Sequence, residues 1–112
     1  MKKQVKKSEA LSLKREVERA IKEFEEEGKV KVRGGKFRIK ITKVPKPYLA
    51  YIRGNTINVD FSVRKYPKYV LKYIVAHELA HTVTGGHSKR FYEIVSFLYP
   101  NFKKAQRKLR SN

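Results

Sequence analysis

The sequence predicts a small α+β domain, in which a twisted β-sheet of about three or four strands packs on two helices. Apolar residues recur at helical spacing in residues 1–28 and again in residues 67–99, and they alternate with polar residues in residues 29–61. At 112 residues, the chain is long enough for one hydrophobic core but not for two. We therefore expect a single domain over residues 1–112.

The N-terminal helix is predicted within residues 1–28. Its apolar positions recur every three or four residues and form one stripe, made by Ala10, Leu13, Val17, Ala20, Ile21 and Phe24. Charged residues fill the positions between them, and Gly28 is a natural helix terminator. We expect this helix to cover one face of the sheet. The alternative is a short coiled coil that binds a partner, although the pattern spans only about two heptads.

The strands follow the first helix. Alternating apolar residues over 30–41, with a turn at Gly34-Gly35, are typical of a β-hairpin with one buried face. Residues 49–53 and 56–61 are predicted to form two further strands. An open edge at residues 49–53 could border the functional site and pair with an extended peptide, whereas an interior position would exclude this.

A central helix is predicted from residues 69–83, because apolar residues cover nearly all its sides and Lys72 is the one obvious outward position. Such a helix should be buried. Ser88 is well placed to cap the next helix, which should end at Pro100. The basic segment 100–112 has few apolar residues, so we expect at most a loosely docked last helix there.

The central helix carries the clearest functional motif, His77-Glu78-x-x-His81. Residues four apart on an α-helix face the same side, so both imidazoles can bind one metal ion. Glu78 lies about 100° around the helix, where its carboxylate can reach a water molecule without acting as a ligand. The alternative is that these are ordinary polar or core-edge histidines whose spacing arises by chance.

The third histidine of the chain, His87, follows a glycine pair. On a continuous helix it would point away from the other two histidines. Gly85-Gly86 can adopt left-handed backbone conformations, which end the helix and let His87 return to the same ion. Three protein ligands leave a fourth position open, which is typical of a catalytic zinc site. Histidine sites also accept cobalt, nickel or iron.

The charge of the chain is large and unevenly distributed. Residues 1–27 contain eight Lys/Arg and seven Glu, whereas residues 28–112 contain twenty Lys/Arg and only three acidic residues, a balance of +17. This basic part favours polyanions or acidic protein segments, so nucleic acid is one candidate partner. The alternative is the lysine-rich surface found in thermophile proteins, which is usually also rich in glutamate.

Composition also restricts the protein class. The chain has no cysteine, which excludes disulfides and thiolate metal sites. We find neither a signal-peptide pattern nor the roughly 18 consecutive apolar residues of a membrane span. The expected localisation is therefore the cytoplasm.

The stretch from Tyr73 to His81, with His87-Ser88-x-x-Phe91 and Pro100 beyond it, resembles the minigluzincins, very small soluble zinc metallopeptidases of thermophilic prokaryotes. It is also similar to SprT-like, Wss1-like and YgjP-like metallopeptidases and to the catalytic domains of HtpX-type membrane metallopeptidases. The chain has neither a Met-turn nor the Trp-Gly-Ser-Cys stretch typical of YgjP-like proteins.

This resemblance implies an α+β peptidase that binds one zinc ion through His77, His81 and His87, with Glu78 as general base and acid. It also implies latency, because a C-terminal segment blocks the cleft in such proteins, either within one molecule or between two. Residues 100–112 would be that segment here, and an exchange between chains would make a dimer.

Other site residues are less well specified by the sequence. Donors that could stabilise an oxyanion or bind substrate are Tyr48, Tyr51, Tyr92 and Arg53, and carboxylates that could orient a histidine are Asp60 and Glu93. The predicted function is a zinc-dependent endopeptidase or its zymogen. The alternatives are a nucleic-acid-binding protein with a structural metal ion and an inactive scaffold closed by its own tail.

Overall fold

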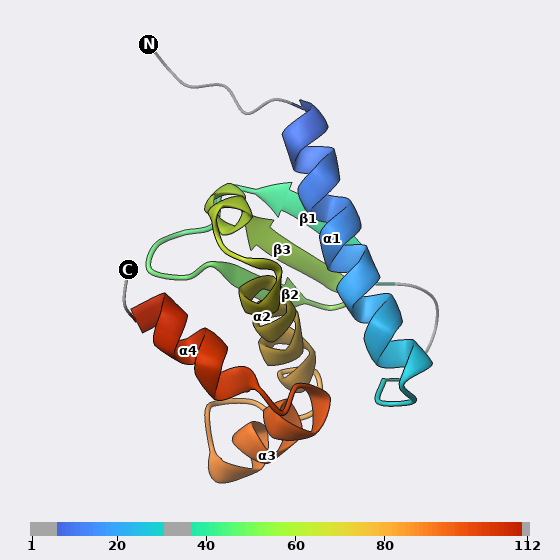
Figure 1. The fold of residues 1–112 in the computed structure, drawn as a ribbon, viewed down its shortest axis with the longest axis vertical. Helices are drawn as coiled ribbons and strands as arrows, with labels where there is room; N and C mark the ends of the chain where they lie inside the picture. Colours follow the sequence, from blue (N-terminus) through green and yellow to red (C-terminus); the bar gives the residue numbers. More distant parts are fainter. Residues whose placement is uncertain (1–6, 31–36, 111–112) are drawn as a thin grey trace.

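The computed structural model describes residues 7–30 and 37–110 (Figure 1). Its elements are α1 (Lys7–Glu26), β1 (Arg38–Thr42), β2 (Ala50–Arg53), β3 (Thr56–Asp60), the 3₁₀ helix η1 (Phe61–Lys65), α2 (Lys68–Ala80), α3 (Lys89–Leu98) and α4 (Phe102–Arg110). The predicted α+β class is confirmed. The expected turn at Gly34-Gly35 and the strand before it fall on residues 31–36, outside the described residues.

The described sheet has the strand order β1-β3-β2. Strand β3 pairs in parallel with β1 and antiparallel with β2. The β2–β3 turn has Gly54 at φ 60°, while Asn55 keeps a negative φ, which is the type II′ combination. Among the described strands β2 is therefore an edge strand, which confirms one of the two interpretations of residues 49–53.

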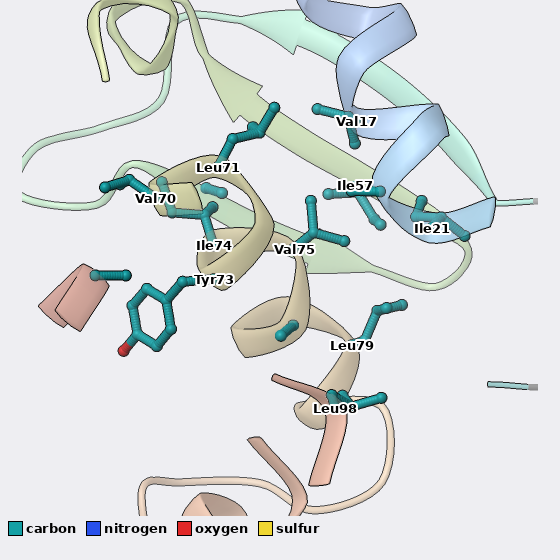
Figure 2. Close-up of a cluster of buried hydrophobic side chains, with 14 of the residues drawn as sticks. Val17, Ile21, Ile57, Val70, Leu71, Tyr73, Ile74, Val75, Leu79 and Leu98 are labelled. Carbon is teal, nitrogen blue, oxygen red and sulfur yellow. The ribbon is translucent and has the colours of Figure 1, made fainter. Parts of the chain in front are cut away.

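Helices α1 and α2 pack on the same face of the sheet (Figure 1). The predicted stripe of α1 is buried at Leu13, Val17, Ala20, Ile21 and Phe24. Figure 2 shows Val17 and Ile21 of α1 directed toward Ile57 of β3 and Val75 of α2. Full burial of such aliphatic side chains contributes roughly 1.5–3 kcal/mol each, so this layer is a main source of stability. It holds α2 in place against the sheet.

Helix α2 is buried on almost all sides, as predicted, but it ends earlier than expected. It stops at Ala80, and Val83, which was expected to be the last buried residue, is 61% exposed. The Thr82 hydroxyl donates a 2.6 Å hydrogen bond to the Leu79 carbonyl, and the Thr82 amide bonds the same oxygen. These local bonds compete with helix continuation. His81 is therefore the C-terminal cap, still with helical φ and ψ.

The two last helices close the domain around the end of α2. The Ser88 side chain accepts a hydrogen bond from the Phe91 amide, which confirms the predicted cap of α3. The expectation of a loosely docked tail was wrong, because Phe102 and Ala105 of α4 are buried and α4 packs against α2. Among the described helices, none combines the length and apolarity that a bilayer crossing requires.

Candidate metal centre and active site

The three histidines converge at the C-terminal end of α2. His77 lies in its last turn, His81 caps it, and His87 returns on the loop that leads into α3. The left-handed conformation that this return requires is found at Gly86, with φ 70°, and not at Gly85. One nitrogen of each ring lies within 4.8 Å of the others.

This arrangement brings all three imidazoles within reach of one metal ion. The Nε2 atoms of His77 and His87 are 3.2 Å apart. Two ligands of a tetrahedral zinc at about 2.0–2.1 Å from the ion would be separated by about 3.3 Å. His77 and His81 are partly buried and His87 is exposed, so solvent reaches the centre from the His87 side. The three imidazoles can therefore bind one zinc ion, which is the expected cofactor.

Glu78 is a buried acid beside this centre, with an exposed fraction of only 5%. Its Oε2 lies 3.0 Å from Nδ1 of His77. An ionised carboxylate can only accept, so this contact places the proton on Nδ1 and leaves the Nε2 lone pair directed at the metal position. Glu78 thus contacts one of the three histidines and also belongs to the lining of the adjoining cleft.

The surroundings of His81 disfavour its protonated form, which cannot bind a metal ion. Burial lowers the pKa of His81, and the imidazoles of His77 and His87 lower it further. A hydrogen bond to the Thr84 carbonyl and the charge of Glu78 act in the opposite direction without cancelling the shift.

A cleft of about 450 Å³ opens between strand β2 and this end of α2. Its lining combines residues of the strand and its preceding loop, the metal centre and the last helix: Pro47, Tyr48, Leu49, Ala50, Tyr51, Ile52, Tyr73, Ile74, His77, Glu78, His81, His87 and Leu109. The walls are mostly apolar, and the titratable groups gather at the metal centre. This combination is typical of an enzyme active site.

Comparison with known families decides the assignment. A family model described as the YgjP-like metallopeptidase domain matches residues 1–112, the whole chain. The chain belongs to the YgjP-like metallopeptidase family. It is therefore a zinc peptidase. Although the chain lacks the Trp-Gly-Ser-Cys stretch, the family model still matches it, so membership in the family does not depend on that stretch.

Solved structures show the same fold. Abylysin from Pyrococcus abyssi, solved as a metallopeptidase zymogen, superposes with a TM-score of 0.70 at 23% identity, covering 85% of this chain and 92% of that chain. Jannalysin from Methanocaldococcus jannaschii, also solved as a zymogen, gives a TM-score of 0.65 at 17% identity, covering 88% and 94%. No curated protein matched the chain. The resemblance to small zinc metallopeptidases drawn from the histidine motif is confirmed.

The other predicted site residues of this YgjP-like domain lie at different distances from the centre. Tyr48 and Tyr51 line the cleft and are 66% and 40% exposed. The Tyr92 ring lies 6.4 Å from the His87 ring but does not line the cleft. Arg53 ends β2 next to the cleft, and Glu93 is exposed on α3.

Asp60 is bound within the fold and contacts none of the histidines. Its carboxylate accepts from the Val44 amide at 2.7 Å and from the Ser62 amide and hydroxyl at 3.0 and 2.6 Å, capping η1. Burial alone would raise the pKa of Asp60, but the hydrogen bonds from Ser62 and Val44 outweigh burial and bring the pKa below its ordinary value. This carboxylate therefore anchors the end of β3.

Replacing Asp60 tests this structural role. We expect Asp60→Asn to lower the free energy of unfolding at pH 7 by about 1–2 kcal/mol, because an amide cannot accept on both sides. The folded pKa lies below the ordinary 3.8, so the stabilisation is complete above that value and is lost as the pH falls through the folded pKa. Denaturant titrations from about pH 7 to 2 should show that the variant's deficit shrinks at acidic pH. A deficit independent of pH would contradict this role.

Tyr73 and Leu109 are among the cleft residues that sequence reasoning missed. Tyr73 precedes His77 by one helical turn and so shares its face, a spacing that could have identified it. Its ring packs edge-on against His77, with 5.9 Å between ring centroids, and its hydroxyl lies 3.2 Å from the Gln106 amide nitrogen of α4. Leu109 lies in a basic tail with no motif around it, so its place in the cleft could not be read from the sequence.

Proposed function

We propose that this YgjP-like metallopeptidase is an endopeptidase in which Glu78 acts first as general base and then as general acid. The observation that supports the proposal most directly is a buried carboxylate adjacent to three converging imidazoles in an open cleft. Zinc held by these imidazoles supplies Lewis acidity and makes water more acidic. Glu78 takes one proton from the attacking water and delivers it to the amine nitrogen as the C–N bond breaks.

Strand β2 is the proposed binding site for the substrate backbone. It is an edge strand of the described sheet, it borders the cleft, and its free edge can form main-chain hydrogen bonds with an extended peptide. Such pairing binds the interior of a chain and does not require a free terminus, which favours endopeptidase activity. The apolar cleft walls beside β2, including Ile52 and Ile74, would receive apolar substrate side chains.

We further propose that α4, within the segment 100–112, keeps this peptidase latent. Leu109 occupies part of the cleft lining, and Gln106 contacts Tyr73 in the same wall. Phe102 and Ala105 fix the beginning of α4 in the core of its own chain, which favours blocking within one molecule over exchange between two. Deleting the whole tail would also damage the core, so a sharper perturbation is needed.

The double variant Gln106→Ala/Leu109→Ala removes the two cleft contacts of α4 but keeps its buried anchors. We expect at least a severalfold rise in kcat/KM for peptide cleavage, because the substrate no longer competes with Leu109. Cleavage should be measured by mass spectrometry with a library of blocked peptides, which also identifies internal cuts. A zinc chelator should abolish cleavage, and added zinc should restore it.

The matched control is Lys103→Ala/Arg107→Ala, which changes two exposed residues of the same helix. An equal rise in this control would mean that general loosening of α4, and not relief of the cleft, is responsible. Cleavage that survives chelation would count against the metallopeptidase mechanism itself.

A further inference from the structure

The face of the sheet opposite α1 and α2 has an unusual composition. Six residues form it in two cross-strand rows: Arg38, Thr56 and Arg53 in the first, and Lys40, Asn58 and Tyr51 in the second. We call this surface the outer sheet face. The alternate residues of the same strands, such as Ile57 and Val59, point to the helices and are fully buried.

The charges of the outer sheet face are exposed, and they have no ion-pair partner in the described part of the chain. Arg38, Lys40 and Arg53 are exposed, and within residues 7–30 and 37–110 no carboxylate forms an ion pair with any of them. Three glutamates of α1 and its C-terminal end, Glu9, Glu23 and Glu27, pair with Arg64, Lys72 and Lys29. Other α1 glutamates line a groove along β1 together with Arg38 and Lys40, but none of them forms an ion pair with these cations in the described part of the chain. Desolvating such cations is unfavourable unless a partner brings negative charge.

The spacing of the rows suits an extended polyanion. Neighbouring strands lie about 4.8 Å apart, and residues two apart on a strand are separated by about 6.7 Å. Arg38 and Arg53 therefore lie about 10 Å apart across the sheet, with Lys40 one row further along. Asp60 lies at the corner of this face, where hydrogen bonds from Val44 and Ser62 hold its carboxylate, and the three cations outnumber this one negative charge.

The aromatic side chain of Tyr51 favours single-stranded nucleic acid over an acidic peptide as the polyanion that binds this face. Tyr51 is 40% exposed, and it pairs across the strands with the buried Asn58, in the same row as Lys40. An acidic peptide could pair with the cations but would have no particular need for an aromatic ring. Single-stranded nucleic acid supplies both phosphates for the cations and bases that stack on exposed aromatic rings.

We propose that the outer sheet face binds single-stranded nucleic acid, with Arg38, Lys40 and Arg53 contacting phosphates and Tyr51 stacking on a base. Tyr51 also lines the cleft, so nucleic acid bound on this face lies next to the peptidase site. The net charge of +18 adds long-range attraction. Binding does not depend on peptide cleavage, so this surface can be tested separately from the proposed endopeptidase.

The test measures binding of a fluorescently labelled oligothymidylate by anisotropy across a salt series, with all variants in a Glu78→Gln background. Removing the three cations as Arg38→Gln/Lys40→Gln/Arg53→Gln should weaken binding about tenfold or more near 0.1 M salt. It should also reduce the slope of log K against log salt by about 2, since each single-strand phosphate contact contributes about 0.7. Tyr51→Ala should weaken binding about 5- to 150-fold with little change in the slope, and Tyr51→Phe should retain it.

The matched control removes the same charge elsewhere, as Lys68→Gln/Lys103→Gln/Arg107→Gln, all at exposed positions. Circular dichroism verifies that every variant is folded. Equal losses in the control and in the outer-face variant would overturn the proposal, because the attraction would then come from net charge alone. The proposal would also be overturned if an equally charged polyglutamate displaced the oligonucleotide at the same concentration. That result would assign the face to acidic proteins.

Discussion

Glu78→Gln is expected to lower kcat/KM for peptide cleavage by about 10²- to 10⁴-fold, the range associated with the loss of a general base. The amide has nearly the same size as the carboxylate but cannot accept a proton at neutral pH. Zinc should still bind, because His77, His81 and His87 are unchanged. The measurement is steady-state cleavage of the best library peptide, together with zinc content by elemental analysis.

A matched control exists on α1, where Glu18 is exposed and far along the chain from the centre. Glu18→Gln makes the same chemical change and should leave both kcat/KM and zinc content unaltered. If Glu78→Gln instead loses zinc in parallel with activity, the carboxylate acts mainly by holding His77 through the 3.0 Å contact. Full activity in the variant would rule Glu78 out as the base.

His81→Ala is expected to reduce bound zinc from one equivalent to a small fraction and to abolish cleavage. We expect His81 to be a central ligand because it caps α2 and its ring lies beside the rings of both His77 and His87. The second readout is thermal: zinc that binds only the folded state raises the midpoint of unfolding in proportion to the logarithm of its concentration, and this rise should vanish in the variant.

His87→Ala provides the comparison. His87 is exposed on a loop, and its replacement leaves the imidazoles of His77 and His81 in place. It should retain weak zinc binding, detectable as a small thermal shift at high zinc concentration. Undiminished zinc binding in His81→Ala would show that the metal occupies another position, and the active-site assignment would have to be abandoned.

The histidine motif could be predicted because its geometry is local. His77 and His81 are separated by one helical turn, and the cap formed by Ser88 follows from three neighbouring residues. For the same reason, the α1 stripe and the buried nature of α2 were readable from periodicity. What these features share is that a few consecutive residues determine them.

Features that depend on distant residues could not be predicted. Nothing in the strand sequences specifies that β3 inserts between β1 and β2, because pairing depends on how each strand meets the helices. Docking of α4 depends on Phe102 finding the Tyr73 ring, 6.4 Å away between centroids. The early end of α2 was missed because the Thr82 hydroxyl competes for a backbone carbonyl, an effect that hydrophobic patterns do not register.

The central place of β3 also implies an order of assembly during folding. Strand β1 precedes β3 by many residues, and in the described sheet its neighbour is β3 alone. The β2–β3 hairpin closes a very short loop and can form within microseconds, whereas β1 must await it and then bridge a longer span. We therefore expect β1 to join the sheet only after the β2–β3 hairpin has formed.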